Sequence, residues 1–314
     1  MVEDMSARFP MGLSMAILAT AALLTNSCAD EAPRTRSTEP PSATSPGRSV
    51  SPLDDEAAIN DLLRSVGLKI DRPVSLPGSE SVAFIIRVPG DSAIETWASA
   101  RDLVTQTGRY PVIVGGPVEY GSGLTSEFEQ TLESAEYLVQ AGVTTESVLA
   151  DASAIDTDRW FQSRTDSLEI TAADLAASAP LPEYDYPKDE FITGTDILTG
   201  APRADIEVAL LPTANGWEAP AYLLWGGWND VPQPDELVAI FKRWSTFYGA
   251  DVVSMTGDVV EMKVTSPPTE DATAIALARE HFLVAPDNVW QGTGDLATLA
   301  AAVLDAPVWY FWWD

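Results

Sequence analysis

The sequence predicts an α+β protein in which a small N-terminal α/β region precedes a tryptophan-rich α+β domain with a mostly antiparallel sheet. From about residue 52 onward, stretches with a helical hydrophobic period alternate with short apolar stretches typical of strands. In the last third, pairs of predicted strands are separated by turn dipeptides. Most of the tryptophans also lie there, namely Trp217, Trp225, Trp228, Trp244, Trp290, Trp309, Trp312 and Trp313.

The chain of 314 residues is strongly acidic, with 47 acidic and 18 basic residues and a formal net charge of -29. Residues 52–314 alone contain 42 acids and 14 bases, a charge of -28. A surface of this sign repels nucleic-acid phosphates and anionic lipid headgroups, which argues against nucleic-acid binding. We interpret the charge mainly as a source of solubility. The alternative is an acidic recognition surface for a basic protein.

The chain contains one cysteine, Cys28, and one histidine, His281. An intramolecular disulfide and the common cysteine and histidine zinc sites are therefore excluded. No metal site or cofactor is predicted, and no catalytic residue is assigned. His281 follows Leu277 and Ala278 at the border of an apolar helix face, where we expect a boundary residue rather than a general base.

A secretory signal is predicted for residues 1–28. Arg8 precedes a run of 14 apolar or small residues from Met11 to Leu24. That length suits the hydrophobic region of a signal peptide and is too short to span a bilayer.

The run ends in Thr25-Asn-Ser-Cys28, which resembles the lipobox of bacterial lipoproteins, where small residues precede the cysteine that receives the lipid. The sequence departs from that pattern because Leu24 stands four residues before the cysteine instead of three. The resemblance implies lipidation of Cys28 and an extracytoplasmic protein anchored to the cell membrane. The alternative is cleavage after Ala29, which would leave a secreted and soluble protein.

Residues 29–51 are predicted to form a disordered tether. Twelve of these 23 residues are proline, serine or threonine, and no apolar period is present. Such a segment would reach about 25 Å as a flexible coil.

Residues 52–180 are predicted to form the N-terminal α/β region. The pattern indicates helices over 53–66, 91–106 and 126–140, and strands over 81–88 and 110–115. From about residue 140 to 203 the chain is acidic and irregular. We interpret this stretch as a solvated connector, with an acidic linker at 181–204. Asp156-Thr-Asp158 and residues 184–190 offer oxygen ligands, but neither has the spacing of a calcium-binding loop.

Residues 205–314 are predicted to form the C-terminal domain, in the order β-β-α-β-β-α-α-β. Strands over 205–211 and 219–225 are expected to form a hairpin through Asn215-Gly216, followed by a helix from Asp235 to Gly249. A second hairpin, over 250–255 and 259–264, is expected to turn at Gly257-Asp258. Two helices, over 270–282 and 295–304, then precede a closing strand over 308–313, whose successive large side chains predict burial of both faces.

Several short sequence words occur in order in this domain: Trp217, Pro220-Ala-Tyr222, Gly226-Gly-Trp-Asn229, Tyr248-Gly-Ala250, Met255-Thr-Gly-Asp258, Gln291-Gly-Thr-Gly294 and Trp309-Tyr-Phe-Trp-Trp-Asp314. In these words the last third of the chain resembles a bacterial family known as domain of unknown function 4253. The resemblance implies a fold and a bacterial origin. It implies no activity.

Trp228, Asn229 and Asp230 are the predicted binding residues. A tryptophan on a glycine-containing turn, beside an amide and a carboxylate, can stack on a sugar ring or a peptide while the polar groups form hydrogen bonds. The alternative is that Trp228 packs on the core and that Gly226 and Gly227 only permit the turn.

Two further motifs are weaker candidates. Gln291-Gly-Thr-Gly294 precedes a predicted helix, but without a lysine it indicates a turn and a cap more than a phosphate site. A glycosidase-like acid and base could be drawn from several carboxylates, and the sequence singles out no pair among Asp230, Asp258, Glu261, Asp287 and Asp314.

These observations favour a cell-envelope lipoprotein that acts as a binding or interaction module, with an envelope glycan or protein as its partner. The alternative is a carboxylate-based hydrolase that acts on a glycan or another envelope substrate. The two differ in a measurable way, because only the hydrolase would turn its ligand over.

Overall fold

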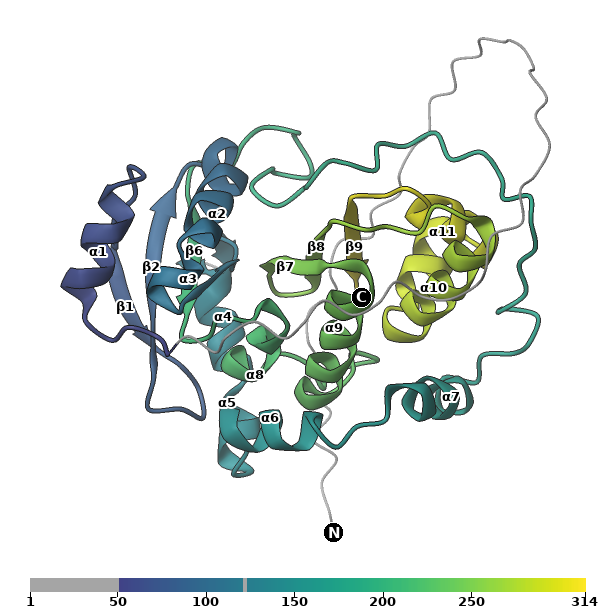
Figure 1. The fold of residues 1–314 in the computed structure, drawn as a ribbon, viewed down its shortest axis with the longest axis horizontal. Helices are drawn as coiled ribbons and strands as arrows, with labels where there is room; N and C mark the ends of the chain where they lie inside the picture. Colours follow the sequence, from purple (N-terminus) through teal and green to yellow (C-terminus); the bar gives the residue numbers. More distant parts are fainter. Residues whose placement is uncertain (1–50, 121–122) are drawn as a thin grey trace.

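The computed structural model describes residues 51–120 and 123–314 (Figure 1). The predicted signal segment, the lipidation candidate Cys28 and all of the predicted tether except Ser51 lie outside these residues. Within them, no helix is both long enough and apolar enough to cross a membrane.

A seven-stranded sheet forms the centre of the described part of the chain, in the order β1-β2-β6-β3-β7-β8-β9. Every neighbouring pair is antiparallel except β3 and β7, which are parallel, so the predicted α+β class with a mostly antiparallel sheet is confirmed. Its strands are β1 (Arg72–Ser75), β2 (Val82–Val88), β3 (Tyr110–Ile113), β6 (Ile206–Leu211), β7 (Ala250–Met255), β8 (Val259–Val264) and β9 (Val308–Trp312). A separate hairpin pairs β4 (Pro117–Tyr120) with β5 (Gly123–Ser126).

This sheet runs across the division predicted at residues 181–204. Strand β6, from the C-terminal side of that division, lies between β2 and β3 of the N-terminal side. Strand β3 then connects β6 to β7. Residues of both regions therefore form one continuous hydrogen-bonded sheet and share one hydrophobic core.

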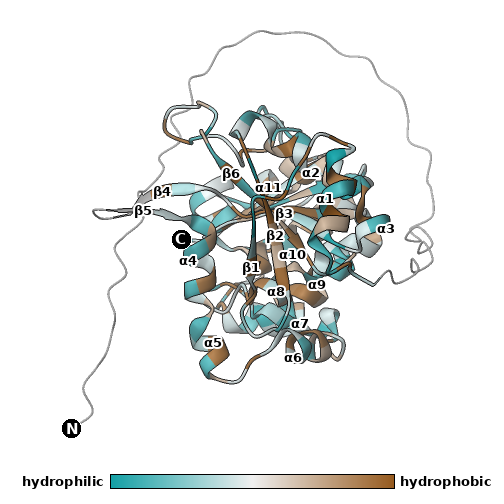
Figure 2. Ribbon diagram, turned by 90° about the vertical axis from the view of Figure 1, so that its left-hand side faces the viewer, coloured by the Kyte–Doolittle hydropathy of each residue, from teal (hydrophilic) through white to brown (hydrophobic). Residues whose placement is uncertain are grey.

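Helices lie on both sides of the strands, and Figure 2 shows the apolar strands between α1, α2 and α3 on one side and α4 and α5 on the other. The helices that precede β6 in the chain are α1 (Glu56–Arg64), α2 (Ala93–Asp102), α3 (Val104–Thr107), α4 (Glu127–Ser134), α5 (Glu136–Gln140), α6 (Thr145–Ala152) and α7 (Thr157–Ser167). The C-terminal part contributes α8 (Ala219–Leu223), α9 (Pro234–Tyr248), α10 (Asp271–Val284) and α11 (Leu296–Val303).

The prediction of a strand over 219–225 is wrong. The chain forms a 3-10 turn at Gly216–Glu218 and then helix α8. Pro220 is placed at the start of α8, where a missing backbone N–H costs nothing, whereas a strand would lose a hydrogen bond there. Asn215-Gly216 therefore makes no hairpin, and the observed order of this region is β-α-α-β-β-α-α-β.

The prediction that residues 140–167 form a solvated connector is also wrong, because this stretch contains α6 and α7. Thr144 and Ser147 form a reciprocal capping box at the start of α6. The side chain of Asp156 accepts a hydrogen bond from the backbone N–H of Arg159 at 3.1 Å and caps α7. Asp156 is thus used as a helix cap.

Residues 168–205, which we call the strap, form no helix or strand beyond a single bridge between Thr195 and Pro202. Figure 1 shows the strap passing around α10 and α11 before it enters β6. The ammonium group of Lys188 donates to the carbonyl oxygens of Ala301 and Leu304 at 2.6 and 2.8 Å, at the C-terminal end of α11.

An aromatic core fills one face of β8 and β9. Trp309, Phe311 and Trp313 are buried on this face, and the ring of Phe311 stacks on that of Trp244 with centroids 5.1 Å apart. The opposite face is only partly covered, because Tyr310 is 40% exposed. The expectation that both faces of the closing strand are buried is therefore wrong for Tyr310.

His281 lies inside this aromatic core and not at its border. Its side chain is 1% exposed, and its ring centroid is 4.9 Å from that of Trp244 and 4.7 Å from those of Trp309 and Phe311. Burial lowers the pKa of His281 to about 3, because the charged imidazolium would lose its hydration there. His281 is therefore a neutral core residue and is not placed to act as a general base.

We predict that acid destabilises the protein through His281. The pKa is about 3 in the folded protein and 6.5 for an ordinary histidine, so between these values the unfolded chain binds a proton that the folded chain does not. The contribution of His281 is fully present above about pH 6.5 and falls by about 1.4 kcal/mol per pH unit toward pH 3. Denaturant unfolding of the wild type and of His281→Phe at several pH values measures this slope.

The difference between the two proteins isolates His281, because the carboxyl groups titrate in both. The neighbouring carboxylate of Glu280 is bound to Arg243 and to the indole N–H of Trp244, neither of which is changed. Equal slopes in the wild type and in His281→Phe would contradict the prediction.

Candidate functional site

Strand directions bring several chain segments to one end of the sheet. The parallel strands β3 and β7 end there, and so does β9, because β9 is antiparallel to β8 and β8 is antiparallel to β7. We define the carboxyl end of the sheet by Gly115, Gly116, residues 256–258 and residues 312–314. At this end β3 has the antiparallel strand β6 on one side and the parallel strand β7 on the other.

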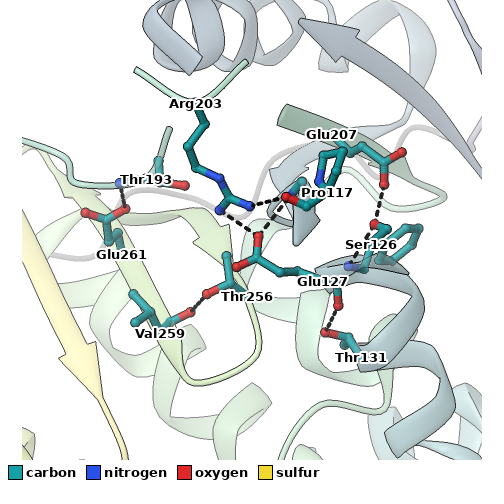
Figure 3. Close-up of polar contacts among 12 residues, drawn as sticks. Pro117, Ser126, Glu127, Thr131, Thr193, Arg203, Glu207, Thr256, Val259 and Glu261 are labelled. Atoms are coloured by element: carbon teal, nitrogen blue, oxygen red, sulfur yellow. Dashed lines mark hydrogen bonds and ion pairs between the residues drawn. The ribbon is translucent and has the colours of Figure 1, made fainter. Parts of the chain in front are cut away.

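An ion pair lies at the centre of this end (Figure 3). The guanidinium group of Arg203 donates to the carboxylate of Glu127 at 2.7 Å and to the carbonyl oxygen of Pro117 at 3.2 Å. The same carboxylate accepts from the backbone N–H of Gly116 at 2.7 Å. Gly115, with φ of +87°, must be glycine, because a Cβ atom would lie 2.1 Å from Glu127 Oε2.

Two buried carboxylates flank this pair. Glu207 is 1% exposed and receives hydrogen bonds or ion pairs from Arg72 and Arg87, both at 3.0 Å, and from the hydroxyl of Ser126 at 2.8 Å. Because its oxygens are occupied by these donors, Glu207 fixes the start of α4 to the sheet.

Glu261 is the second buried carboxylate and is also 1% exposed. It accepts from the backbone N–H groups of Ile192 and Thr193 at 2.7 and 3.0 Å and from the hydroxyl of Ser254 at 3.0 Å. Burial raises the pKa of Glu261, while these three hydrogen bonds act against the rise. Glu261 thus holds the strap to the sheet.

The loop that carries the predicted binding residues has an unusual backbone. Four of its residues have positive φ: Leu224 at 46°, Gly226 at 125°, Gly227 at 80° and Asn229 at 46°. For a bulky residue such as Leu224 this conformation costs about 1–2 kcal/mol, so the surrounding contacts must impose it. The glycines are also required by space, because a Cβ atom on Gly226 would lie 2.4 Å from the carbonyl oxygen of Pro232.

Trp228 stands at the rim of this loop. Its ring packs edge-to-face on the buried ring of Trp225, with centroids 5.9 Å apart, and remains partly exposed. Trp225 in turn donates its indole N–H to the carbonyl oxygen of Thr256 at 2.7 Å and contacts the ring of Trp313. Trp228 is therefore supported by the core without being enclosed in it.

Asn229 and Asp230 are held through one polar group each and are otherwise exposed. The side-chain amide of Asn229 donates to the backbone carbonyl of Asp314 at 2.9 Å. The backbone carbonyl of Asp230 accepts from Arg164, whose guanidinium group lies over the ring of Trp160. The carboxylate of Asp230 thus remains exposed on an anchored backbone.

Three of the carboxylates proposed from the sequence also gather at this end. The side-chain amide of Gln291 donates to Asp287 at 3.0 Å and to Asp314 at 3.2 Å, and the backbone N–H of Asp314 donates to Asp287. Asp258 accepts from the indole N–H of Trp312 at 3.2 Å. Partial removal from water, followed by the charges of Glu127 and Asp314, raises the pKa of Asp258, and the Trp312 hydrogen bond opposes the rise.

Gln291-Gly-Thr-Gly294 forms no anion site ahead of α11. Its residues lie in and just after a π-helical turn, Asn288–Thr293. Asp295 caps α11 by accepting from the backbone N–H of Thr298 at 2.8 Å, so a carboxylate already occupies the helix start.

A cavity of about 340 Å³ opens beside the Arg203 side chain and is lined by Pro117, Asp196, Thr199, Ala201, Pro202, Arg203, Ala204 and Asp205. A second cavity, of about 420 Å³ and more apolar, lies between the β1–β2 loop and helices α4 and α5. Among the residues with described positions, no group of three or more histidine, cysteine or acidic side chains could hold a metal ion.

Sequence reasoning did not assign Glu127 and Arg203 to this site. They are 76 residues apart, and each stands in a stretch with many other charged residues. The local signal that could have indicated the site is Gly115-Gly116 directly after a buried strand, which marks a close approach of the backbone to another group.

The fold thus defines a mixed α+β protein with an aromatic and acidic surface at the carboxyl end of its sheet. Residues 207–314 match the family model of a domain of unknown function, DUF4253, which confirms the resemblance in the C-terminal third. The chain matches no curated protein and no solved structure. Several words that carry the resemblance, including Gly226-Gly-Trp-Asn229 and Met255-Thr-Gly-Asp258, lie at the carboxyl end of the sheet.

Proposed function

We propose that the protein is an extracytoplasmic lipoprotein of the cell envelope and that the loop bearing Trp228 binds a glycan of that envelope. The observation that supports binding at this loop is its construction. A partly exposed indole is supported by a buried one, on a backbone with four positive φ angles. A large apolar ring beside fixed amide and carboxylate groups suits the apolar face and the hydroxyls of a sugar.

The position of the first described residues fits this proposal. Pro52 lies against Gly108, and the backbone N–H of Leu53 donates to the carbonyl oxygen of Thr107 at 2.8 Å. These contacts are at the start of β3, at the opposite end of the sheet from Trp228. A tether entering there would leave the proposed binding surface on the side away from the anchor.

We predict that Trp228→Ala reduces the affinity of the mature protein for purified cell-wall glycan fragments at least tenfold, because the stacking surface is removed. Isothermal titration calorimetry of the two proteins measures the change. Tyr186→Ala is the matched control, since Tyr186 is a 51% exposed aromatic residue on the strap and its loss should leave affinity unchanged.

Thermal unfolding of the same variants separates loss of binding from loss of fold. The proposal fails if the wild-type protein binds no fragment, or if Trp228→Ala binds as tightly as the wild type.

Attachment to the membrane is tested independently through Cys28. We predict that intact-mass analysis of the membrane fraction finds a diacylglyceryl group on the wild-type protein and that Cys28→Ala removes both the mass and the membrane association. A soluble mature chain that begins after Ala29 would contradict the proposal of a lipid anchor. The proposed glycan site would then be tested only by the binding measurements.

A second candidate function is hydrolysis of the glycan, which the raised pKa of Asp258 favours. Its pKa is raised by removal from water and by the charges of two other carboxylates, Glu127 and Asp314, and a raised carboxyl pKa is one requirement of a general acid. We predict that, if the protein is a hydrolase, Asp258→Asn abolishes release of new reducing ends while binding is retained. Absence of turnover by the wild type on fragments that it binds would reject this candidate.

A further inference from the structure

The outer face of β8 and β9 carries a row of side chains distinct from the Trp228 loop. Tyr310 is paired with Glu261, Trp312 with Val259 and Val308 with Lys263. Because side chains alternate along a strand, Val308, Tyr310 and Trp312 share the face opposite the buried Trp309 and Phe311. The strap lies against this face, because Glu261, the partner of Tyr310 on β8, accepts hydrogen bonds from the backbone N–H groups of Ile192 and Thr193.

The two aromatic residues on this face, Tyr310 and Trp312, are accessible to solvent and lie two residues apart on the same strand. Tyr310 is 40% exposed, and Trp312 is partly exposed. Their Cα atoms, two residues apart on one strand, are separated by about 7 Å. The indole of Trp312 is oriented by its hydrogen bond to Asp258. The row therefore offers two rings on one strand, and the orientation of the Trp312 ring is fixed.

The free edge of β9 is closed by one side chain. Asn288 donates from its amide to the carbonyl oxygen of Tyr310 at 2.7 Å and accepts from the backbone N–H of Trp312 at 3.0 Å. A protein partner that adds a strand needs these two backbone groups. Recognition at this face must therefore use the rings and their polar neighbours and not the backbone of β9.

The negative charge of the molecule also limits the class of ligand that this face can bind. Residues 52–314 carry a formal charge of -28, and Asp258 lies beside Trp312. Anionic polysaccharides would be repelled from this face, whereas uncharged sugars can stack on the rings and donate their hydroxyls to the nearby carboxylate.

We propose that Tyr310 and Trp312 form a second carbohydrate surface, which binds a linear, uncharged polysaccharide with successive sugars stacked along β9. The proposal extends the proposed function to a longer ligand, and its residues are separate from those of the Trp228 loop.

The test uses the mature chain and N-acetylglucosamine oligomers as probes. Tyr310→Leu keeps an apolar side chain and removes the planar ring, and it should lower affinity for a hexasaccharide at least tenfold. Tyr310→Phe keeps the ring and should stay within about twofold of the wild type. Both substitutions are on an exposed position, and their unfolding temperatures confirm that the fold is retained.

The outcomes distinguish the two surfaces. Hexasaccharide binding that is weakened by Trp228→Ala but unchanged by Tyr310→Leu overturns the second surface and leaves the proposed function intact. If Tyr310→Leu weakens hexasaccharide binding and Trp228→Ala does not, the second surface is supported and the proposed site at Trp228 is contradicted. If neither the wild type nor Tyr310→Phe binds the hexasaccharide, or if a polyuronate binds more tightly, the proposal for β9 is overturned.

Discussion

The position of β3 is the constraint on which the rest of the structure depends. Strand β3 is antiparallel to β6 on one side and parallel to β7 on the other. Tyr110, Val112 and Ile113 are all 0% exposed, and the hydroxyl of Tyr110 donates to the carbonyl oxygen of Val252 at 2.9 Å. Because β6 and β7 both belong to the region that matches DUF4253 but do not pair with each other, this region completes its sheet only with a strand from residues that precede it.

The chain has few basic side chains, and some of them form hydrogen bonds and ion pairs at both ends of this sheet. At the amino end of β3, Arg109 is buried and donates to the carbonyl oxygens of Leu53 and Val82 and to the carboxylate of Asp54. Burial lowers the pKa of Arg109, and the charge of Asp54 opposes this. At the carboxyl end, Arg203 is bound to Glu127. A chain with 14 bases in residues 52–314 thus commits several of them to internal pairs, which leaves a net negative exterior.

Local periodicity was enough to predict the strands over 250–255 and 259–264 and the helix from Asp235, because each has a strong apolar pattern of its own. It failed for residues 219–225, where large apolar side chains resemble a strand but Pro220 and the packing of Ala221 and Leu223 favour a helix. It also failed for α7, whose many charged residues conceal the two buried rings of Trp160 and Phe161. The Glu127–Arg203 pair could not be predicted, because it depends on the order of strands and not on neighbouring residues.

The location of the candidate site follows from a difference between the two ends of the sheet. The amino end of β3 receives Leu53 and is closed by Arg109, whereas the carboxyl end collects turns and the last residues of β9. Turn residues at that end, such as Asn229 and Asp258, are fixed by hydrogen bonds yet keep exposed polar atoms. Rigid exposed groups lose little entropy when a ligand binds, which is the physical reason for proposing recognition at this end of the sheet.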